Sequence, residues 1–253
     1  MINTTEVRKE LEKQLYYYQS VSLEEIDSVM LMNRRVIKFF FHAVFLKKIL
    51  EKAKIHYRVL EINNLRQFQY MTTYFDTPEF MLYKDHMNGK QNRYKIRQRR
   101  YDVTGNEFFE VKFKTNKGFT LKSRIENNSL VYFNNKTETF LRDQTPYKNE
   151  NFKESVKDQF TRITLVNNQL TERITLDYNI SFSHHKKDYS YPNLGIVEVK
   201  LDNKPGTSMI LKIMRDLKIR PQSISKYCLG VASLYQNMKI NNLKPQLLKI
   251  DKL

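Results

Sequence analysis

Cations recur at alternate positions in the segment NRYKIRQRRY, residues 92–101. Read as a β-strand, the segment places Arg93, Lys95, Arg97 and Arg99 on one face. A row of like charges repels itself, so an anion that offsets the repulsion would favour such a face. Arginine binds phosphate oxygens in bidentate fashion and lysine acts as a point charge. The chemistry that fits is therefore the binding of a phosphate-rich anion.

The same alternation of charged and apolar residues recurs in five further segments. The charged residues are Glu110, Lys112 and Lys114 in 107–114, Lys122 and Arg124 in 120–125, Arg162 in 160–166, Arg173 and Asp177 in 172–180, and Glu198 and Lys200 in 195–201. One interpretation is an ordinary sheet with a solvated face. The other is a closed barrel with its charges inside, wide enough at eight strands for a small ligand. In that barrel, Glu110 and Glu198 would bind Mg²⁺ or Mn²⁺ that bridges the phosphates.

The overall charge agrees with an anionic partner. The chain has 253 residues, 44 Lys and Arg against 27 Asp and Glu, and a net charge of +17. Such an excess favours nucleic acid, an anionic membrane surface or phosphate-rich small molecules. No helix-turn-helix, zinc-finger or RNP-type motif is evident, so we expect no nucleic-acid partner. The chain has six glycines and no glycine-rich P-loop, which argues against a conventional NTPase mechanism.

Cysteine content and hydropathy indicate the class of protein. The single cysteine, Cys228, excludes an intramolecular disulfide and a multi-cysteine zinc site, and indicates a reduced, intracellular setting. The first residues carry charges and no apolar signal core. The longest apolar run, residues 39–46, is too short to span a bilayer. We therefore expect a soluble, cytoplasmic protein, and the 40% of hydrophobic residues predicts a globular one.

The elements that would position these charges follow from periodicity. Helical spacing is predicted over 5–32, with a second, turn-bounded piece from Ser22, and over 41–55, 207–218 and 225–240. Strand spacing is predicted over 70–76, 92–102, 107–114, 119–126, 129–133, 159–166, 171–182 and 194–202. The polar stretch 142–158 is interpreted as a loop or short helix. The expected fold class is α+β, with one antiparallel β domain and helices before and after it.

Eight motifs occur in a fixed order over residues 34 to about 235. They are RRVIKF (34–39), YFDTPEFMLY (74–83), RYKIRQRRY, FFEVKFK, LKSRI, FTR with ERITLD, VEVKL and SISKYCLG (223–230). In this combination the chain resembles the VTC-type polyphosphate polymerase domain, within the triphosphate tunnel metalloenzyme (CYTH-like) superfamily. The resemblance implies an antiparallel, eight-stranded β tunnel barrel lined by basic residues and flanked by N- and C-terminal helices. It also implies transfer of the γ-phosphate of ATP to a growing polyphosphate chain.

The resemblance implies a role for each matching residue. The catalytic cations would be Arg97, Arg99, Lys112, Arg162, Arg173 and Lys226. The other phosphate-site residues would be Lys38, Glu110, Lys122, Arg124, Lys200 and Ser225. Glu198 would hold the metal, Mn²⁺ or Mg²⁺. Ser225 and Lys226 would lie near a helix start, where exposed N–H groups favour anions.

The implied domains are an N-terminal helical extension (1–33), a VTC-like tunnel domain (34–241) and a C-terminal tail (242–253). The expected partners are ATP and polyphosphate or triphosphate. A membrane-protein partner and the oligomeric state are left open. Phe160 stands where the family often has tyrosine, and Val36 where many relatives have glutamate. Phosphate binding is thus better supported than a particular reaction. The alternatives are a tunnel-fold inorganic or nucleoside triphosphatase, and a non-catalytic polyphosphate- or nucleic-acid-binding protein.

Overall fold

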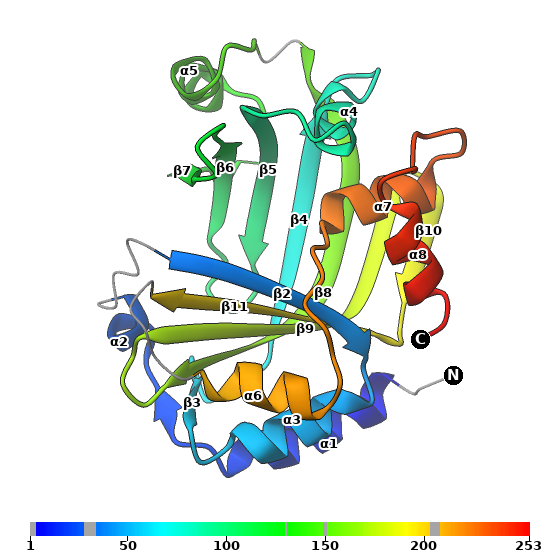
Figure 1. The fold of residues 1–253 in the computed structure, drawn as a ribbon. Coiled ribbons are helices and arrows are strands. Elements are labelled where there is room, and N and C mark those ends of the chain that lie inside the picture. The colour runs from blue at the N-terminus through cyan, green and yellow to red at the C-terminus, as the bar shows by residue number, and fades with distance from the viewer. Residues whose placement is uncertain (1–3, 28–33, 130, 149–150, 203–207) are drawn as a thin grey trace.

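A single large sheet dominates the computed structural model (Figure 1), which describes residues 4–27, 34–129, 131–148, 151–202 and 208–253. The strands are β1 (Ser20–Val21), β2 (Arg34–His42), β3 (Tyr57–Leu60), β4 (Phe68–Asp76), β5 (Arg93–Tyr101), β6 (Glu107–Lys114), β7 (Thr120–Glu126), β8 (Lys153–Asn167), β9 (Glu172–His184), β10 (Lys187–Tyr191) and β11 (Leu194–Asp202). The helices are α1 (Thr4–Tyr16), α2 (Leu23–Asp27), α3 (Phe45–Ala53), α4 (Met81–Met87), α5 (Asn135–Gln144), α6 (Met209–Asp216), α7 (Lys226–Leu234) and α8 (Lys244–Ile250). None of these helices is long and apolar enough to cross a membrane.

The sheet is antiparallel along its main path, in the order β2-β11-β9-β8-β4-β5-β6-β7. β10 pairs with β9, and β3 pairs with β8 and, in parallel, with β1. The α+β class, the antiparallel sheet and the flanking helices are thus confirmed.

The prediction of a closed, eight-stranded barrel is wrong. Eight strands form the path, but the sheet has eleven strands in all, and the described parts of β2 and β7 do not pair with each other. The N–H of Gln222 donates to the carbonyl of Lys38 at 2.8 Å, so the segment before α7 occupies a backbone acceptor of β2. An open sheet with a charged inner face results.

One apolar face of the sheet is covered by helices α1, α3 and α6. The largest core cluster joins side chains of β2, β8, β9 and β11, such as Phe39, Leu165, Leu176 and Val197, to residues of these helices, such as Leu46. Figure 1 shows the three helices together below the sheet. The period-two alternation therefore works as expected in β2, β8, β9 and β11, whose apolar residues face this helical layer.

Two further helical layers complete the fold. α5 packs through Leu141 against Phe75, Ile96 and Phe109 of β4, β5 and β6. α7 and α8 cover the other side of the sheet at one end, where Phe182 belongs to the same cluster as their apolar residues. The charged residues lie on the same side of the sheet as α7, beyond this apolar end.

Several element predictions need correction. The helix expected over 5–32 is instead α1, the short strand β1 and α2, and 28–32 lie outside the described residues. The segment 34–42 is a strand, so the helix expected from residue 41 begins only at Phe45. Within 129–133 no described residue forms a strand. Where a loop was expected over 142–158, α5 ends and β8 begins.

Gly230 lets α7 approach the sheet closely. A Cβ added there would lie 2.7 Å from both Phe182 Cδ1 and Val156 Cγ1. Alanine favours a helix over glycine by about 1 kcal/mol, but overpacking a core typically costs about 1–3 kcal/mol. We expect Gly230→Ala to lower the free energy of unfolding by about 1 kcal/mol, measured by urea unfolding. A variant as stable as the parent would contradict this close packing.

Candidate anion-binding site

The strand register places the predicted charged residues on one face, which we call the charged face. Lys38 of β2 lies opposite Glu198 of β11. Further along the path, Glu110 of β6 lies between Arg97 of β5 and Arg124 of β7. Antiparallel partners directly opposite each other point to the same side of a sheet. Positions that are distant in sequence therefore meet on this face, as the alternation predicts.

Glu198 is the centre of the first cluster on the charged face. Its Oε2 lies 3.2 Å from Nζ of Lys38, and its Oε1 lies 3.3 Å from Nζ of Lys200. Burial alone would raise the pKa of Glu198, but Lys38, Lys200 and Lys112 outweigh it and hold the pKa well below its usual range. Glu198 is therefore a carboxylate, and its oxygens are turned to cations.

Glu110 is the centre of the second cluster. Arg97 donates from Nε to its Oε2 at 2.7 Å, and the Arg97 Nη2 lies 2.6 Å from the same oxygen. Lys122 pairs with Oε1. Burial opposes ionisation of Glu110, but Arg97, Arg99 and Lys122 lower its pKa to about 2. Arg124 points its guanidinium over another side chain of the face, the Phe108 ring, 4.5 Å from the ring centroid.

Asp177 is the centre of a third cluster, which the sequence analysis did not assign to the site. Arg162 binds both carboxylate oxygens, from Nε at 2.6 Å and from Nη2 at 2.7 Å, and Lys226 contacts Oδ2. Burial would raise the pKa of Asp177, but Arg162 and Lys226 lower it to about 2. The signal was present in the sequence, because Asp177 shares a strand face with Arg173.

Aromatic rings contact the cations of the third cluster. Phe160 lies at a β-bulge in β8, a feature that changes the direction of a side chain. Its ring centroid is 3.7 Å from Nζ of Lys226, and its ring stacks on Tyr70 at 5.4 Å. The Arg162 guanidinium carbon lies 4.8 Å from the Tyr70 centroid. Sequence reasoning missed Tyr70, because its place beside Phe160 depends on the pairing of β4 with β8, which residue spacing does not show.

The three clusters act on one another electrostatically. Burial lowers the pKa of Lys112 to about 7, and Arg97, Lys38 and Lys95 add to the effect, while Glu198 opposes it. Lys38 of β2 and Lys95 of β5 bind the adjacent residues Ile224 and Ser225, so the curl of the sheet brings these distant strands of the path close together. Lys95, which was not assigned to the site, donates to Ser225 Oγ at 2.8 Å.

The remaining predicted residues occupy the margins of the charged face. Arg173 lies opposite Lys200 in the β9–β11 register. Arg99 donates from Nε to Thr72 Oγ1 at 3.2 Å. Ser225 caps α7, accepting from the N–H of Cys228 at 3.4 Å, which confirms the predicted helix start. The phosphate contacts assigned to all these residues stay predictions.

The charged face suits a metal ion that a carboxylate of the protein and phosphates of a substrate hold together. Among the described residues, no three Asp, Glu, His or Cys side chains are grouped so as to hold a metal. An all-protein cage is therefore not formed by them. Mg²⁺, however, is commonly held by one or two carboxylates together with substrate phosphates. Glu198 suits that kind of shared ion, because it is ionised and partly exposed.

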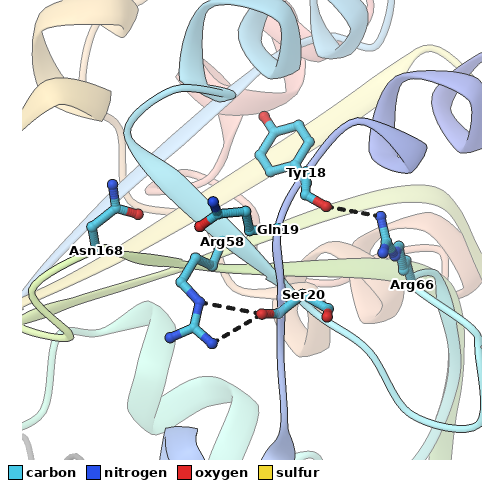
Figure 2. Close-up of a pocket in the computed structure, with 6 residues that line it drawn as sticks. All are labelled: Tyr18, Gln19, Ser20, Arg58, Arg66 and Asn168. Carbon is cyan, nitrogen blue, oxygen red and sulfur yellow. Dashed lines mark hydrogen bonds between the residues drawn. The ribbon is translucent and has the colours of Figure 1, made fainter.

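A hollow of about 760 Å³ elsewhere on the molecule does not have the excess of cations that marks the charged face. Figure 2 shows its lining residues, Tyr18, Gln19, Ser20, Arg58, Arg66 and Asn168. Arg58 donates to the Ser20 carbonyl at 2.9 and 3.2 Å, and Arg66 donates to that of Tyr18 at 3.2 Å. Both arginines also pair with glutamates. Their donors serve the fold, in contrast to the excess of cations on the charged face.

Comparison with known proteins agrees with the motif order. The model of the VTC domain family matches residues 33–235, while a search of curated proteins finds no match. A Hippeastrum protein provisionally named adenylyl cyclase, with a dominant triphosphatase activity, is 12% identical at a TM-score of 0.49, covering 81% of this chain and 98% of that one. A Vibrio parahaemolyticus protein, provisionally named adenylate cyclase, is 12% identical at 0.43, covering 84% and 98%. A Pyrococcus horikoshii protein is 17% identical at 0.42, covering 77% and 95%. At these scores, the three likenesses say nothing about activity.

Removing the central carboxylate of the third cluster should destabilise the protein. Asp177→Asn leaves the cations Arg162 and Lys226 without their acidic partner, at a cost of about 3–5 kcal/mol. The folded-state pKa of about 2 lies below the ordinary value of 3.8, so Asp177 stabilises the fold above pH 4 and loses this effect as pH falls. Urea unfolding should show the difference at pH 7 and its narrowing below about pH 4. Asp85→Asn, at a surface pair with Lys90, should cost at most about 1 kcal/mol.

Anion binding should take up protons near pH 8. Burial and neighbouring cations lower the pKa of Lys112 to about 7 and that of Lys95 to about 8, so both are partly neutral there. A bound anion favours their charged forms. Calorimetry with inorganic tripolyphosphate, in buffers of different ionisation enthalpy, should show weaker binding as pH rises from 7 to 9. Lys112→Met should take up about one proton fewer at pH 8. Equal uptake by both proteins would contradict the assignment.

Proposed function

This chain belongs to the VTC domain family, and on that premise we propose that it is an ATP-dependent polyphosphate polymerase. The reaction would transfer the γ-phosphate of ATP to the end of a growing polyphosphate chain. The catalytic unit would be the stretch 34–241, with 1–33 as an extension and 242–253 as a tail. The charged face of the open sheet would take the place of a closed tunnel.

One observation carries the proposal: three carboxylates each hold two cations on a single sheet face. Glu198, Glu110 and Asp177 pair with Lys38 and Lys200, with Arg97 and Lys122, and with Arg162 and Lys226, respectively. Further cations, among them Arg99 and Lys112, add to the charge of the face. A multiply charged phosphate chain is the ligand that would satisfy this excess.

The proposed roles follow from the contacts. Arg97 contacts Glu110 through two of its nitrogens, and Arg162 contacts Asp177 in the same way. The guanidinium planes of both arginines therefore have set orientations for phosphate oxygens. Lys226 lies at the start of α7, where backbone N–H groups also favour anions. Phosphoryl transfer needs mainly alignment and charge stabilisation from a protein. The acceptor is already an oxyanion, so no strong general base is required.

Glu198 would hold a divalent ion, Mn²⁺ or Mg²⁺, together with the phosphate oxygens of the substrate. Such an ion would supply Lewis-acid stabilisation of negative charge on the phosphate groups. Lys38 and Lys200 lie on the two Glu198 oxygens. They would therefore hold the carboxylate in place before the ion and the substrate arrive together.

Hydrolysis is the alternative reaction of the same site. A triphosphatase would use the same cations but direct water to the terminal phosphate, and a binding protein would show no turnover. Incubation of the protein with ATP and Mn²⁺, followed by sizing of the products on a gel, separates the three. A ladder of phosphate polymers supports the polymerase; orthophosphate alone, or unchanged ATP, contradicts it.

Glu198→Gln should reduce turnover by at least about 100-fold, because the neutral amide no longer binds the ion. The shape of the side chain is retained, so thermal unfolding should remain cooperative. Product formation from ATP measures the effect. The matched control is Glu10→Gln, the same chemical change at a half-exposed glutamate that pairs with Lys47 on the helical side of the sheet. Full activity of Glu198→Gln would reject this assignment of the metal-binding residue.

A further inference from the structure

The end of the charged face next to α4 gathers cations that lack acidic partners. Arg93 lies opposite Lys114, and Lys95 lies opposite Lys112, in the β5–β6 register. Like charges directly opposite each other destabilise a sheet. The ion pairs of the charged face centre on Glu198, Glu110 and Asp177, and among the described residues no ion pair includes any of these four cations. No ion pair among the described residues therefore offsets the repulsion between Arg93 and Lys114.

His86 lies on α4, which packs against β5, the strand of Arg93 and Lys95. The Nδ1 atom of His86 is buried and has no hydrogen-bond partner among the described residues. Burial, together with Lys95, Arg93, Lys114 and Lys38, lowers the pKa of His86 to about 2. The ring is therefore neutral, adds no repulsion and can donate one N–H. A buried polar atom without a partner is uncommon in a folded protein and calls for an explanation.

The cations near His86 are continuous with the clusters described above. Lys95 reaches Ser225 Oγ at 2.8 Å, at the cap of α7. Lys38 lies 3.4 Å from the carbonyl of Ile224 and 3.2 Å from Glu198 Oε2. A line of cations thus runs from Glu198 through Lys38 and Lys95 to Arg93 and Lys114, beyond the cluster of Glu198.

We propose that His86, Arg93 and Lys114 form a second anion subsite. This subsite binds the phosphate groups by which a long linear polyphosphate exceeds the length of a triphosphate. The inference rests on the proposed function and names the substrate it favours: long chains over triphosphate. Arg93 would bind phosphate oxygens in bidentate fashion, Lys114 would act as a point charge and His86 would donate a neutral hydrogen bond. An anion there would offset the cross-strand repulsion and satisfy His86.

The test compares two ligands on each variant. Calorimetry at one salt concentration gives the dissociation constants of inorganic tripolyphosphate and of a long-chain linear polyphosphate, counted per chain. Their ratio expresses the preference for the long chain. We expect the double variant Arg93→Gln/Lys114→Gln to lose about tenfold in this ratio, equivalent to about 1.4 kcal/mol. His86→Phe, which keeps every charge and a flat ring, should lose about threefold.

The matched control removes two charges elsewhere. Lys84 on α4 and Lys52 on α3 are exposed, and Lys52→Gln/Lys84→Gln should keep the ratio of the parent protein. A ratio that stays unchanged in Arg93→Gln/Lys114→Gln and in His86→Phe, or that falls equally in the control, overturns the subsite. The proposed function is decided separately, by the products that the parent protein forms from ATP. A parent protein that binds neither ligand overturns both. If the double variant does not fold, His86→Phe decides.

Discussion

The cost of gathering positive charge on a partly buried sheet face governs this structure. Each of Glu198, Glu110 and Asp177 accepts two cations, and these carboxylates keep the face folded without an anion. They do not neutralise it, because each is outnumbered by its own partners. Positive charge therefore remains on the face of the folded protein, and a bound phosphate chain would offset it. Stability and ligand preference thus depend on the same contacts.

The rest of the fold serves that face. Helices α1, α3 and α6 bury one side of the sheet, while α7 and α8 cover the apolar end of the side that carries the charges. α7 adds its N-terminus to the site, and its position depends on the close approach allowed at Gly230. The rings of Tyr70 and Phe160 lie against the cations of Arg162 and Lys226, respectively. Cation–π contacts of this kind attract a cation without adding a negative charge that would repel a bound anion. Core packing and charge placement are therefore linked at each layer.

Strict alternation made much of this predictable from the sequence. β5, β6, β7, β9 and β11 carry it over most of their length, and they were placed to within about two residues. β2 was not predicted, because Phe39, Phe40 and Phe41 are all buried and show no alternation. Closure of the barrel is a long-range property of strand edges, which residue spacing does not encode. Asp177 was visible on its face, but its role as the partner of Lys226 depends on a contact between residues 49 positions apart.

The open path from β2 to β7 has a mechanical consequence. In a closed barrel, strand number and shear fix the diameter through backbone hydrogen bonds. Here no described hydrogen-bonded pairing joins the two end strands, so the spacing between them is not fixed in that way. The segment before α7 links the two sides instead: Gln222 donates to the Lys38 carbonyl on β2, and Ser225 accepts from Lys95 on β5. The distance across the charged face is therefore set by a connecting segment and not by the shear of a barrel.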